Sequence, residues 1–552
     1  MSEQIEHNCG VVLVARYRDD EGDEKDWSQN FHCVEIAAKI ARHLQHRGEL
    51  GAGVSWLSKS KVSGERFHSV KKNGRVSHVI RNYAAQFAQV LSELVLAHTR
   101  YATSGPADEA MLQPRHHKDK RHRKEFIFGF NGNEPDYSKQ RAALKNRGLR
   151  PTLPGDTEII GLTLVDAFRQ KGRRGLMEIC KELGVFEGSF NLVLATGDGR
   201  AAALRDPYGR HPLVYAKHGP FVIVASEDSA IRRAIPSIEN IQDIPPGYII
   251  DIEREKNRCE LARCLDEEGM VDPRSCFFER VYFANVDSTF DGFSVADTRY
   301  KTGEYLALND ADMEEPSDMV VAVPASAELA AIGYADFSGI PFVPAIQKNH
   351  GVGRTFTSPK NREQKALAKY RIDGDKIAGK SITLVDDSLV RGTTMRVLIK
   401  MLRQKGARKI HLRLASPPIL APCFYGIDFP TVSELLVRKY SDGSLQEGGV
   451  LPPEVLAAIA KDLGVDSIKY LPFSQLADVM GKPLKQLCTS CVDGEYATEG
   501  VQQLYEIENL NTSQKKDHKQ MHACPSSVSS RKPCTEQRHP HHNKKRRNKI
   551  RQ

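Results

Sequence analysis

The run from Ile382 to Thr394, ITLVDDSLVRGTT, constrains the fold of this chain more than any other segment. It opens with four apolar or β-branched residues, which are typical of a buried strand, and two adjacent aspartates follow. A helical pattern of apolar residues then extends from Met395 to Lys405, and Ile410 to Leu414 alternates as a second strand. The segment therefore predicts a βαβ unit, whose ligands bind where strands end and helices begin.

The turn within this unit predicts a sugar-phosphate ligand. Its hydroxyls and backbone amides can surround a phosphate at a helix N-terminus, and Asp386 and Asp387 can accept hydrogen bonds from two ribose hydroxyls. The Gly-Lys-Ser/Thr ending of a nucleotide-triphosphate P-loop is missing. An acidic turn that only caps a helix is the simpler alternative. The whole run resembles the phosphoribosyl-pyrophosphate loop of type I phosphoribosyltransferases, which implies that the 5-phosphate is held by Ser388, Arg391, Gly392, Thr393 and Thr394.

Length and charge limit the number of domains and the class of protein that the rest of the chain can form. Its 552 residues suffice for two or three domains, and no apolar run approaches the roughly 20 residues that span a bilayer. The N-terminus, MSEQIEHNCG, lacks the features of a secretory signal, so we expect a cytoplasmic protein. The net charge of +9 arises in the tail, because the segment from Lys515 onward is strongly basic. We expect residues 506–552 to be a disordered tail that is either simply solvated or in weak contact with nucleic acid.

The pattern of strands and helices divides the chain into two folded parts. Residues 9–252 mix strands and helices without strict alternation, which predicts an α+β domain. A polar connector is expected over 253–272. Strands and helices then alternate over 273–505, which predicts an α/β domain with a parallel sheet.

Five short motifs in the first part together indicate a catalytic site. They are Cys9-Gly10, Gln45 to Gly48, His98 to Gly105, Asn131 to Asn133 and Gly155 to Glu158. In this order they resemble the glutaminase domain of class II amidotransferases, which implies the α+β sandwich of N-terminal-nucleophile hydrolases. The resemblance implies that Cys9 is the nucleophile, that Arg100 and Asp156 bind glutamine, and that Asn131 and Gly132 donate to the oxyanion.

Cys9 needs a base, because a thiol must lose its proton to attack an amide. Its own α-amine, with a reference pKa of about 7.7–8.0, can serve only if Cys9 is the true N-terminus. We therefore predict that residues 1–8 are a propeptide. The alternative for Cys9 is a small, inert buried residue.

A glutaminase joined to a phosphoribosyltransferase resembles the amidophosphoribosyltransferase family of purine synthesis, over nearly all of residues 9–505. The iron–sulfur branch of that family has four cysteine ligands, which match Cys276, Cys423, Cys488 and Cys491. Four thiolates are the ligands of a [4Fe–4S] cluster, but zinc also accepts four cysteines, and a lone C-x-x-C pair is a weak signal. The eleven cysteines of a cytoplasmic chain argue against a disulfide framework.

The resemblance also implies the reaction. Ammonia released from glutamine would displace pyrophosphate from phosphoribosyl pyrophosphate and give 5-phosphoribosylamine. Mg²⁺ would lie near Ser326, Asp386 and Asp387, and Lys348 and Arg354 would belong to a loop that closes over the substrate. Purine nucleotides are the inhibitors that the resemblance implies, and a homo-oligomer is the expected assembly.

Three segments depart from the family pattern. Pro324 to Ala327 lacks an acid and a hydroxyl, Lys348 to Arg354 has His350 and Gly351 in place of arginine and tyrosine, and Glu49 replaces glutamine. Three hypotheses therefore stay open: an active amidophosphoribosyltransferase, a diverged paralogue with uncoupled glutaminase or altered phosphoribosyl substrate, and a non-catalytic nucleotide sensor.

Overall fold

The computed structural model describes residues 9–18, 32–62, 65–90, 92–101, 109–119, 124–171, 174–265, 271–349, 370–427, 429 and 431–522. The described residues up to Glu508 belong to one compact unit, and Asn509 to His522 belong to a second. None of the helices in these ranges has the length and apolar character needed to cross a bilayer. The predictions for the propeptide 1–8, for Arg354 and for the tail beyond residue 522 lie outside the described residues.

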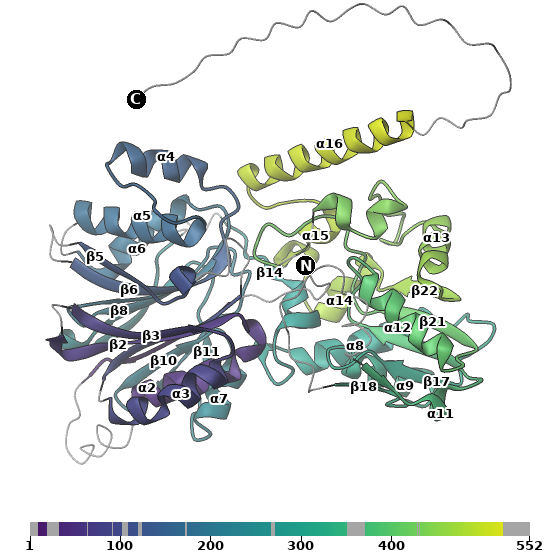
Figure 1. The fold of residues 1–552 in the computed structure, drawn as a ribbon, viewed down its shortest axis with the longest axis horizontal. Coiled ribbons are helices and arrows are strands. Elements are labelled where there is room, and N and C mark those ends of the chain that lie inside the picture. Colours follow the sequence, from purple (N-terminus) through teal and green to yellow (C-terminus); the bar gives the residue numbers. More distant parts are fainter. Residues whose placement is uncertain are drawn as a thin grey trace, which may run out of the picture. The chain divides into compact units, whose positions relative to one another are not determined.

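Two antiparallel sheets form the first half of the chain (Figure 1). The first has the order β11-β9-β10-β1-β4-β2-β3. Its strands are β1 (Gly10–Arg16), β2 (Gly51–Val62), β3 (Glu65–Asn73), β4 (Leu94–Arg100), β9 (Val214–His218), β10 (Phe221–Ala225) and β11 (Gln242–Asp243). The second has the order β13-β12-β8-β7-β6-β5. Its strands are β5 (Arg115–Asp119), β6 (Lys124–Asn133), β7 (Ser189–Thr196), β8 (Ala201–Arg205), β12 (Tyr248–Glu253) and β13 (Arg258–Arg263).

Helices cover the outer face of each sheet, so this half is a four-layer sandwich (Figure 1). The alternation along β1 explains the layers, because Val11 and Leu13 pack between the sheets while Val12 and Val14 pack beneath the helices. The helices on the first sheet are α2 (Cys33–His43), α3 (Val76–Gln89) and α7 (Asp228–Ala234). Those on the second are α4 (Ser138–Asn146), α5 (Asp156–Lys171) and α6 (Leu176–Cys180). The predicted α+β sandwich is confirmed.

The first half extends beyond the boundary predicted at residue 252. Strand β13 pairs antiparallel with β12 in full register, from Tyr248 opposite Arg263 to Glu253 opposite Arg258. The predicted connector 253–272 therefore contains an edge strand of the sandwich. Its alternation is weak in the sequence because an edge strand is half-exposed and carries charged residues.

A four-stranded parallel sheet forms the core of the second half, in the order β17-β20-β21-β22. The strands are β17 (Met319–Ala322), β20 (Ser381–Asp386), β21 (Lys409–Leu414) and β22 (Ser467–Tyr470). Helices α12 (Thr393–Gln404) and α13 (Pro453–Leu463) pack on one face, and α8 (Val295–Leu308) and α9 (Glu328–Ser338) pack on the other. The predicted parallel sheet and the βαβ unit β20-α12-β21 are confirmed, with both faces buried as such sheets require.

The C-terminal segment differs from its prediction. Helix α16 (Glu499–His522) continues well past residue 505, where the sequence analysis predicts disorder from 506. Its Glu, Gln, Leu and Lys residues have high helix propensity, and Gln503 donates a hydrogen bond to Glu499 one turn earlier. A polar helix has no apolar stripe, so the spacing of apolar residues in the sequence does not indicate this helix.

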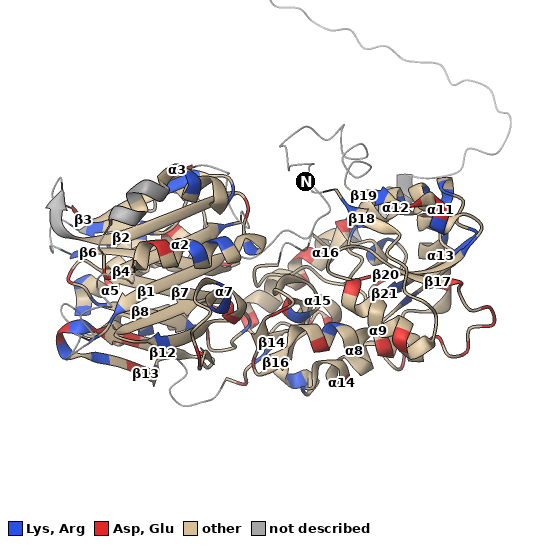
Figure 2. Cartoon of the chain, turned by 90° about the horizontal axis from the view of Figure 1, so that it is seen from below, with Lys and Arg blue, Asp and Glu red and all other residues tan. Residues whose placement is uncertain are grey.

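Charges of both signs are interspersed over the described helices and strands (Figure 2). The residues from Lys515 onward hold twelve Lys and Arg against two Asp and Glu, so the rest of the chain is close to neutral. The basic balance of the sequence therefore says little about the ligands of the folded part.

Candidate functional site

The predicted glutamine site is assembled by the first sheet. Cys9 directly precedes β1, whose Gly10 pairs with Thr99 in β4, and β4 ends at Arg100. The backbone N–H of Tyr101 donates to Cys9 Sγ at 3.4 Å. Asp156 begins α5, and its charge and those of Arg100 and Arg47 all act on the thiol, so the structure brings the predicted nucleophile and glutamine-binding residues together.

Asn131 and Gly132 lie at the end of β6 and have the character of an oxyanion hole. Both polar atoms of the Asn131 amide are buried without a hydrogen-bond partner among the described residues, so the amide is available to a ligand. A Cβ at Gly132 would lie 1.9 Å from the carbonyl oxygen of Ser189 on β7. Only glycine therefore fits this close approach of strands.

Burial raises the pKa of the Cys9 thiol to about 12. Arg100 and Arg47 act in the opposite direction, and Asp156 adds to the rise. The thiol is therefore protonated near neutral pH in this buried site, and catalysis needs a base beside it. This agrees with the requirement for a free α-amine at Cys9, although the predicted propeptide lies outside the described residues.

Glu134 is a residue of this site that the sequence analysis missed. Its backbone N–H donates to Asp156 Oδ2 at 3.1 Å, and its own Oε2 accepts from the Gly188 N–H at 2.7 Å. Burial raises the pKa of its carboxyl from 4.5 to about 8. The only sequence signal was its place directly after the Asn131 to Asn133 motif.

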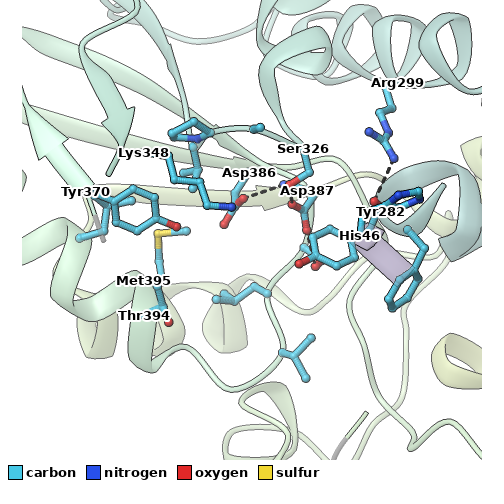
Figure 3. Close-up of a pocket in the computed structure, with 18 of the residues that line it drawn as sticks. His46, Tyr282, Arg299, Ser326, Lys348, Tyr370, Asp386, Asp387, Thr394 and Met395 are labelled. Atoms are coloured by element: carbon cyan, nitrogen blue, oxygen red, sulfur yellow. Dashed lines mark hydrogen bonds between the residues drawn. The ribbon is translucent and has the colours of Figure 1, made fainter. Parts of the chain in front are cut away.

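The predicted phosphoribosyl loop lines a cavity of about 410 Å³ (Figure 3). Asp386 ends β20, and Ser326 Oγ donates to Asp387 Oδ2 across the cavity wall. Gly392 has a left-handed φ of 80°, and a Cβ there would meet Leu436 at 2.8 Å. The predicted residues that line the cavity are Ser326, Lys348, Asp386, Asp387, Ser388, Arg391, Gly392 and Thr394. Thr393 begins α12 between the last two.

Further lining residues come from segments that the sequence analysis did not connect to this site. Arg299 of α8 is buried, and its guanidinium donates to the carbonyl oxygens of Tyr282 and Ala284. Tyr282 and Tyr370 also line the cavity (Figure 3). No local pattern marks these residues, because their positions depend on tertiary packing.

Two lining residues, His46 and Glu49, belong to the first half of the chain. They flank Arg47, which lies within electrostatic reach of Cys9. A Cβ at the intervening Gly48 would lie 2.6 Å from the backbone of Arg100, so this turn presses against the glutamine site. One four-residue turn therefore touches both candidate sites.

A buried ionic network fixes this turn. Arg47 donates to Glu227 Oε1 and to Glu279 Oε1 at 2.5 Å each, and all three side chains are almost fully buried. Glu227 Oε2 accepts from the Asn285 N–H and from Ser288 Oγ, so the same carboxylate also holds the cavity wall. Burial alone would raise the pKa of Glu279, but Arg47 and His211 bring it down to about 2. The network links the two halves through one buried guanidinium shared by two buried carboxylates.

The four predicted ligand cysteines gather around a second, smaller cavity. Strand β14 (Ser275–Cys276) pairs in parallel with β23 (Leu487–Cys488), which places Cys276 beside Cys488. The loop before Cys423 is tied to α15 (Ser490–Asp493) by hydrogen bonds from Leu420 and Ala421 to the carbonyl oxygen of Cys491. All nine cysteines in the described ranges are free thiols. Cys276 and Cys491 are buried and Cys423 and Cys488 are half-buried. Four thiols are a donor set that fits either an iron–sulfur cluster or zinc.

Comparison with known proteins places these sites in one family. The chain is 32% identical to amidophosphoribosyltransferase 1, chloroplastic, of Arabidopsis thaliana, over 90% of this chain and 79% of that protein. It is 33% identical to the amidophosphoribosyltransferase of Methanocaldococcus jannaschii, over 85% and 96% of the two chains. The chain belongs to the amidophosphoribosyltransferase family.

Two further comparisons agree with this membership in the amidophosphoribosyltransferase family. Residues 98–233 match a family model described as a glutamine amidotransferase domain. The fold matches glutamine phosphoribosylpyrophosphate amidotransferase from B. subtilis, solved in complex with ADP and GMP, with a TM-score of 0.74 and 28% identity. That match covers 89% of this chain and 98% of the other, so the two halves occur together in the relative.

Proposed function

We propose that this chain hydrolyses glutamine and uses the ammonia to convert phosphoribosyl pyrophosphate into 5-phosphoribosylamine, with release of glutamate and pyrophosphate. The observation that carries the proposal is the shared cavity. It is lined by the Asp386-Asp387 loop and also by His46 and Glu49, which flank the turn beside the Cys9 site. Cys9, Arg100, Asn131 and Asp156 do not line this cavity, so the link between the two sites is the turn itself, whose Gly48 packs against the backbone of Arg100. An ammonia path from Cys9 would run along this turn.

In the first half, Cys9 attacks the amide carbon of glutamine. Its α-amine takes the thiol proton and returns it to the leaving nitrogen, so ammonia departs and a thioester remains. Water then hydrolyses the thioester to glutamate and regenerates the thiol. Asn131 and the N–H of Gly132 stabilise the oxyanion, while Arg100 and Asp156 hold the α-carboxylate and α-amine of glutamine.

In the second half, the ammonia nitrogen bonds to C1 of the ribose as the C1–O bond to pyrophosphate breaks. Asp386 and Asp387 hold the ribose hydroxyls, and the loop from Ser388 to Thr394 holds the 5-phosphate. Ser326, Asp386 and Asp387 would hold Mg²⁺, which neutralises charge on the departing pyrophosphate. The altered 324–327 turn is compatible with this role, because its remaining hydroxyl, Ser326, is bonded to Asp387 in the cavity.

The cofactor proposed for the cysteine cavity is a [4Fe–4S] cluster held by Cys276, Cys423, Cys488 and Cys491. Four cysteine thiols line one cavity, which is the ligand set of such a cluster. Zinc accepts the same donors, and the resemblance of these cysteines to the ligands of the iron–sulfur branch of the family favours the cluster. The cluster joins the β14–β23 pair to the loop that contains Cys423.

Purine nucleotides are the proposed inhibitors, since the B. subtilis relative was solved with ADP and GMP. Their phosphates match the chemistry of the Ser388 to Thr394 loop. Homo-oligomer formation, a cytoplasmic location and contact of the tail with nucleic acid stay predictions.

One assay on anaerobically purified protein tests the proposal. The protein receives glutamine, Mg²⁺ and phosphoribosyl pyrophosphate, and glutamate and pyrophosphate are measured together. We expect equal yields of the two products. Glutamate without pyrophosphate, or neither product, would refute the proposed transfer.

A further inference from the structure

Arg210 of the glutaminase half forms part of the wall of the cysteine cavity. It lies in the turn between β8 and β9, and its side chain is 1% exposed. Its backbone carbonyl oxygen accepts a hydrogen bond from the Cys276 N–H at 3.0 Å. The first half of the chain therefore contributes a cation to a site whose thiols all come from the second half.

The guanidinium of Arg210 is held in place but is incompletely paired. It lies 4.1 Å from the ring centre of Tyr208 and 3.6 Å from that of Tyr425, and its Nη1 donates to the Gly188 carbonyl oxygen at 3.0 Å. The nearest carboxylate, Asp206, is 3.5 Å from Nη1. Nε and Nη2 are buried and have no hydrogen-bond partner among the described residues.

A buried guanidinium with two unpaired donors is unfavourable unless a negative group faces it. Asp206 supplies one negative charge to Arg210, on the Nη1 side of the guanidinium. The cavity that Arg210 lines is also lined by Cys276, Cys423, Cys488 and Cys491, which would be thiolates as ligands of a metal cluster. The unpaired Nε and Nη2 therefore have thiolate sulfur as a candidate acceptor.

We infer that Arg210 is a positioning and charge-compensating residue for the cluster, and that its guanidinium donates to cysteine sulfur atoms of the cavity that it lines. This inference rests on the proposed [4Fe–4S] cofactor. Hydrogen bonds to sulfur and nearby positive charge are what set the potential of such clusters. Arg210 thereby stabilises the more negative, reduced form and slows the loss of iron.

Residues of the glutaminase half also contact the loop that contains Cys423. Tyr425, which stacks on Arg210, accepts a hydrogen bond at its carbonyl oxygen from His211 at 2.9 Å. The neighbouring carbonyl of Phe424 accepts from Asn133 Nδ2 at 2.9 Å, next to the predicted oxyanion hole. The loop that contains Cys423 therefore contacts the end of β6 next to the predicted oxyanion hole.

The test compares the full-length protein with R210M, R210K and the control R263M, all purified under argon. R263M removes another arginine of the same half that stacks on a tyrosine, Tyr248, outside the cysteine cavity. Three quantities are measured: iron and sulfide content, the midpoint potential from a reductive titration followed by electron paramagnetic resonance, and the rate of iron loss to a chelator. Circular dichroism checks that each variant is folded.

We expect R210M to have a more negative midpoint potential, by about 59 mV if reduction becomes tenfold less favourable, and to lose iron faster. R210K should lie between R210M and the wild type, since it keeps the charge but loses the planar donors. R263M should match the wild type. A folded R210M that fails to retain iron, while R263M retains it, also supports the inference.

A potential and an iron-loss rate in R210M equal to those of the wild type would overturn the role of Arg210 while leaving the cluster intact. Wild-type protein that contains zinc, or no iron and sulfide, would instead refute the cofactor on which the inference rests. Neither outcome bears on the glutamine and phosphoribosyl reactions, which the product assay tests separately.

Discussion

The glutamine site and the phosphoribosyl cavity differ in how their polar side chains are positioned and in how exposed they are. Cys9, Arg100, Asn131 and Asp156 are all buried at the ends of regular elements of one sandwich. The phosphoribosyl cavity combines one contiguous loop with separate segments, and its Lys348 is exposed. The described polar groups of the first site are therefore desolvated, whereas the second site is more open to a large, charged substrate. The turn from His46 to Glu49 is where the two meet.

The largest expected effect separates the two sites at Cys9. C9A should lower glutaminase activity by roughly 10⁴-fold or more, because the nucleophile is removed. Pyrophosphate formation from ammonium chloride should persist, since the phosphoribosyl cavity is untouched. Parallel assays with glutamine and with ammonium chloride measure this. Loss of both activities in a folded C9A protein would show that the sites are not separable.

Removal of Arg47 should break the connection between the two regions. R47M leaves Glu227 and Glu279 buried without their shared cation, which should lower the free energy of unfolding by about 3–5 kcal/mol. R75M is the control, because its pair with Glu49 is exposed and should contribute at most about 1 kcal/mol. Denaturant unfolding of both variants provides the values. Similar stabilities for the two would contradict a stabilising network.

Replacement of Asn131 distinguishes transition-state stabilisation from substrate binding within the glutamine site. N131A should lower kcat for glutamine hydrolysis by roughly 10²–10³-fold with a smaller change in KM, because an oxyanion donor acts mainly in the transition state. N133A is the matched control on the same strand end, since its amide is already used by Phe424. Steady-state kinetics with glutamine distinguish them. A change confined to KM in N131A would assign the amide to substrate binding.

Glu134 should give the stability of the glutamine site a pH dependence, whose effect per pH unit is small. Burial raises its pKa in the folded protein from 4.5 to about 8, so between these values the native state holds a proton that the unfolded chain releases. Its contribution to stability is complete below pH 4.5 and is lost as pH rises toward 8, at up to about 1.4 kcal/mol per pH unit.

E134Q should remove this contribution, because glutamine stays neutral and can still accept from Gly188. The free energy of unfolding should therefore fall less steeply from pH 4.5 to 8 than in the wild type. E239Q, a change of an exposed glutamate, should leave the wild-type slope unchanged. Equal slopes in E134Q and E239Q would show that Glu134 is not protonated in the folded state.

The same contrast explains how much the sequence could predict. The Asp386 to Thr394 loop could be predicted from the sequence, because a strand end, a phosphate-binding turn and a helix start follow one another along the chain. The parallel sheet followed from the same apolar patterns. The glutamine motifs were spread along the chain, and only their order made them recognisable.

Features that depend on tertiary packing were not predictable. His46 and Glu49 reach the phosphoribosyl cavity only because the turn that holds them packs against residues more than 200 positions away. Strand β13 has too little apolar alternation to stand out, and helix α16 has no apolar stripe. The acidity of Glu134 depends on burial, which no local pattern reports.

The central claim is that ammonia passes from the Cys9 site to the phosphoribosyl cavity without entering bulk water. Its most direct test is pyrophosphate formation from glutamine in the presence of glutamate dehydrogenase, 2-oxoglutarate and NADH, which consume free ammonia. The account predicts that the scavenger leaves the wild-type rate with glutamine unchanged, while it suppresses the rate of C9A supplied with a limiting amount of ammonium chloride. Suppression of both rates to the same extent would contradict it.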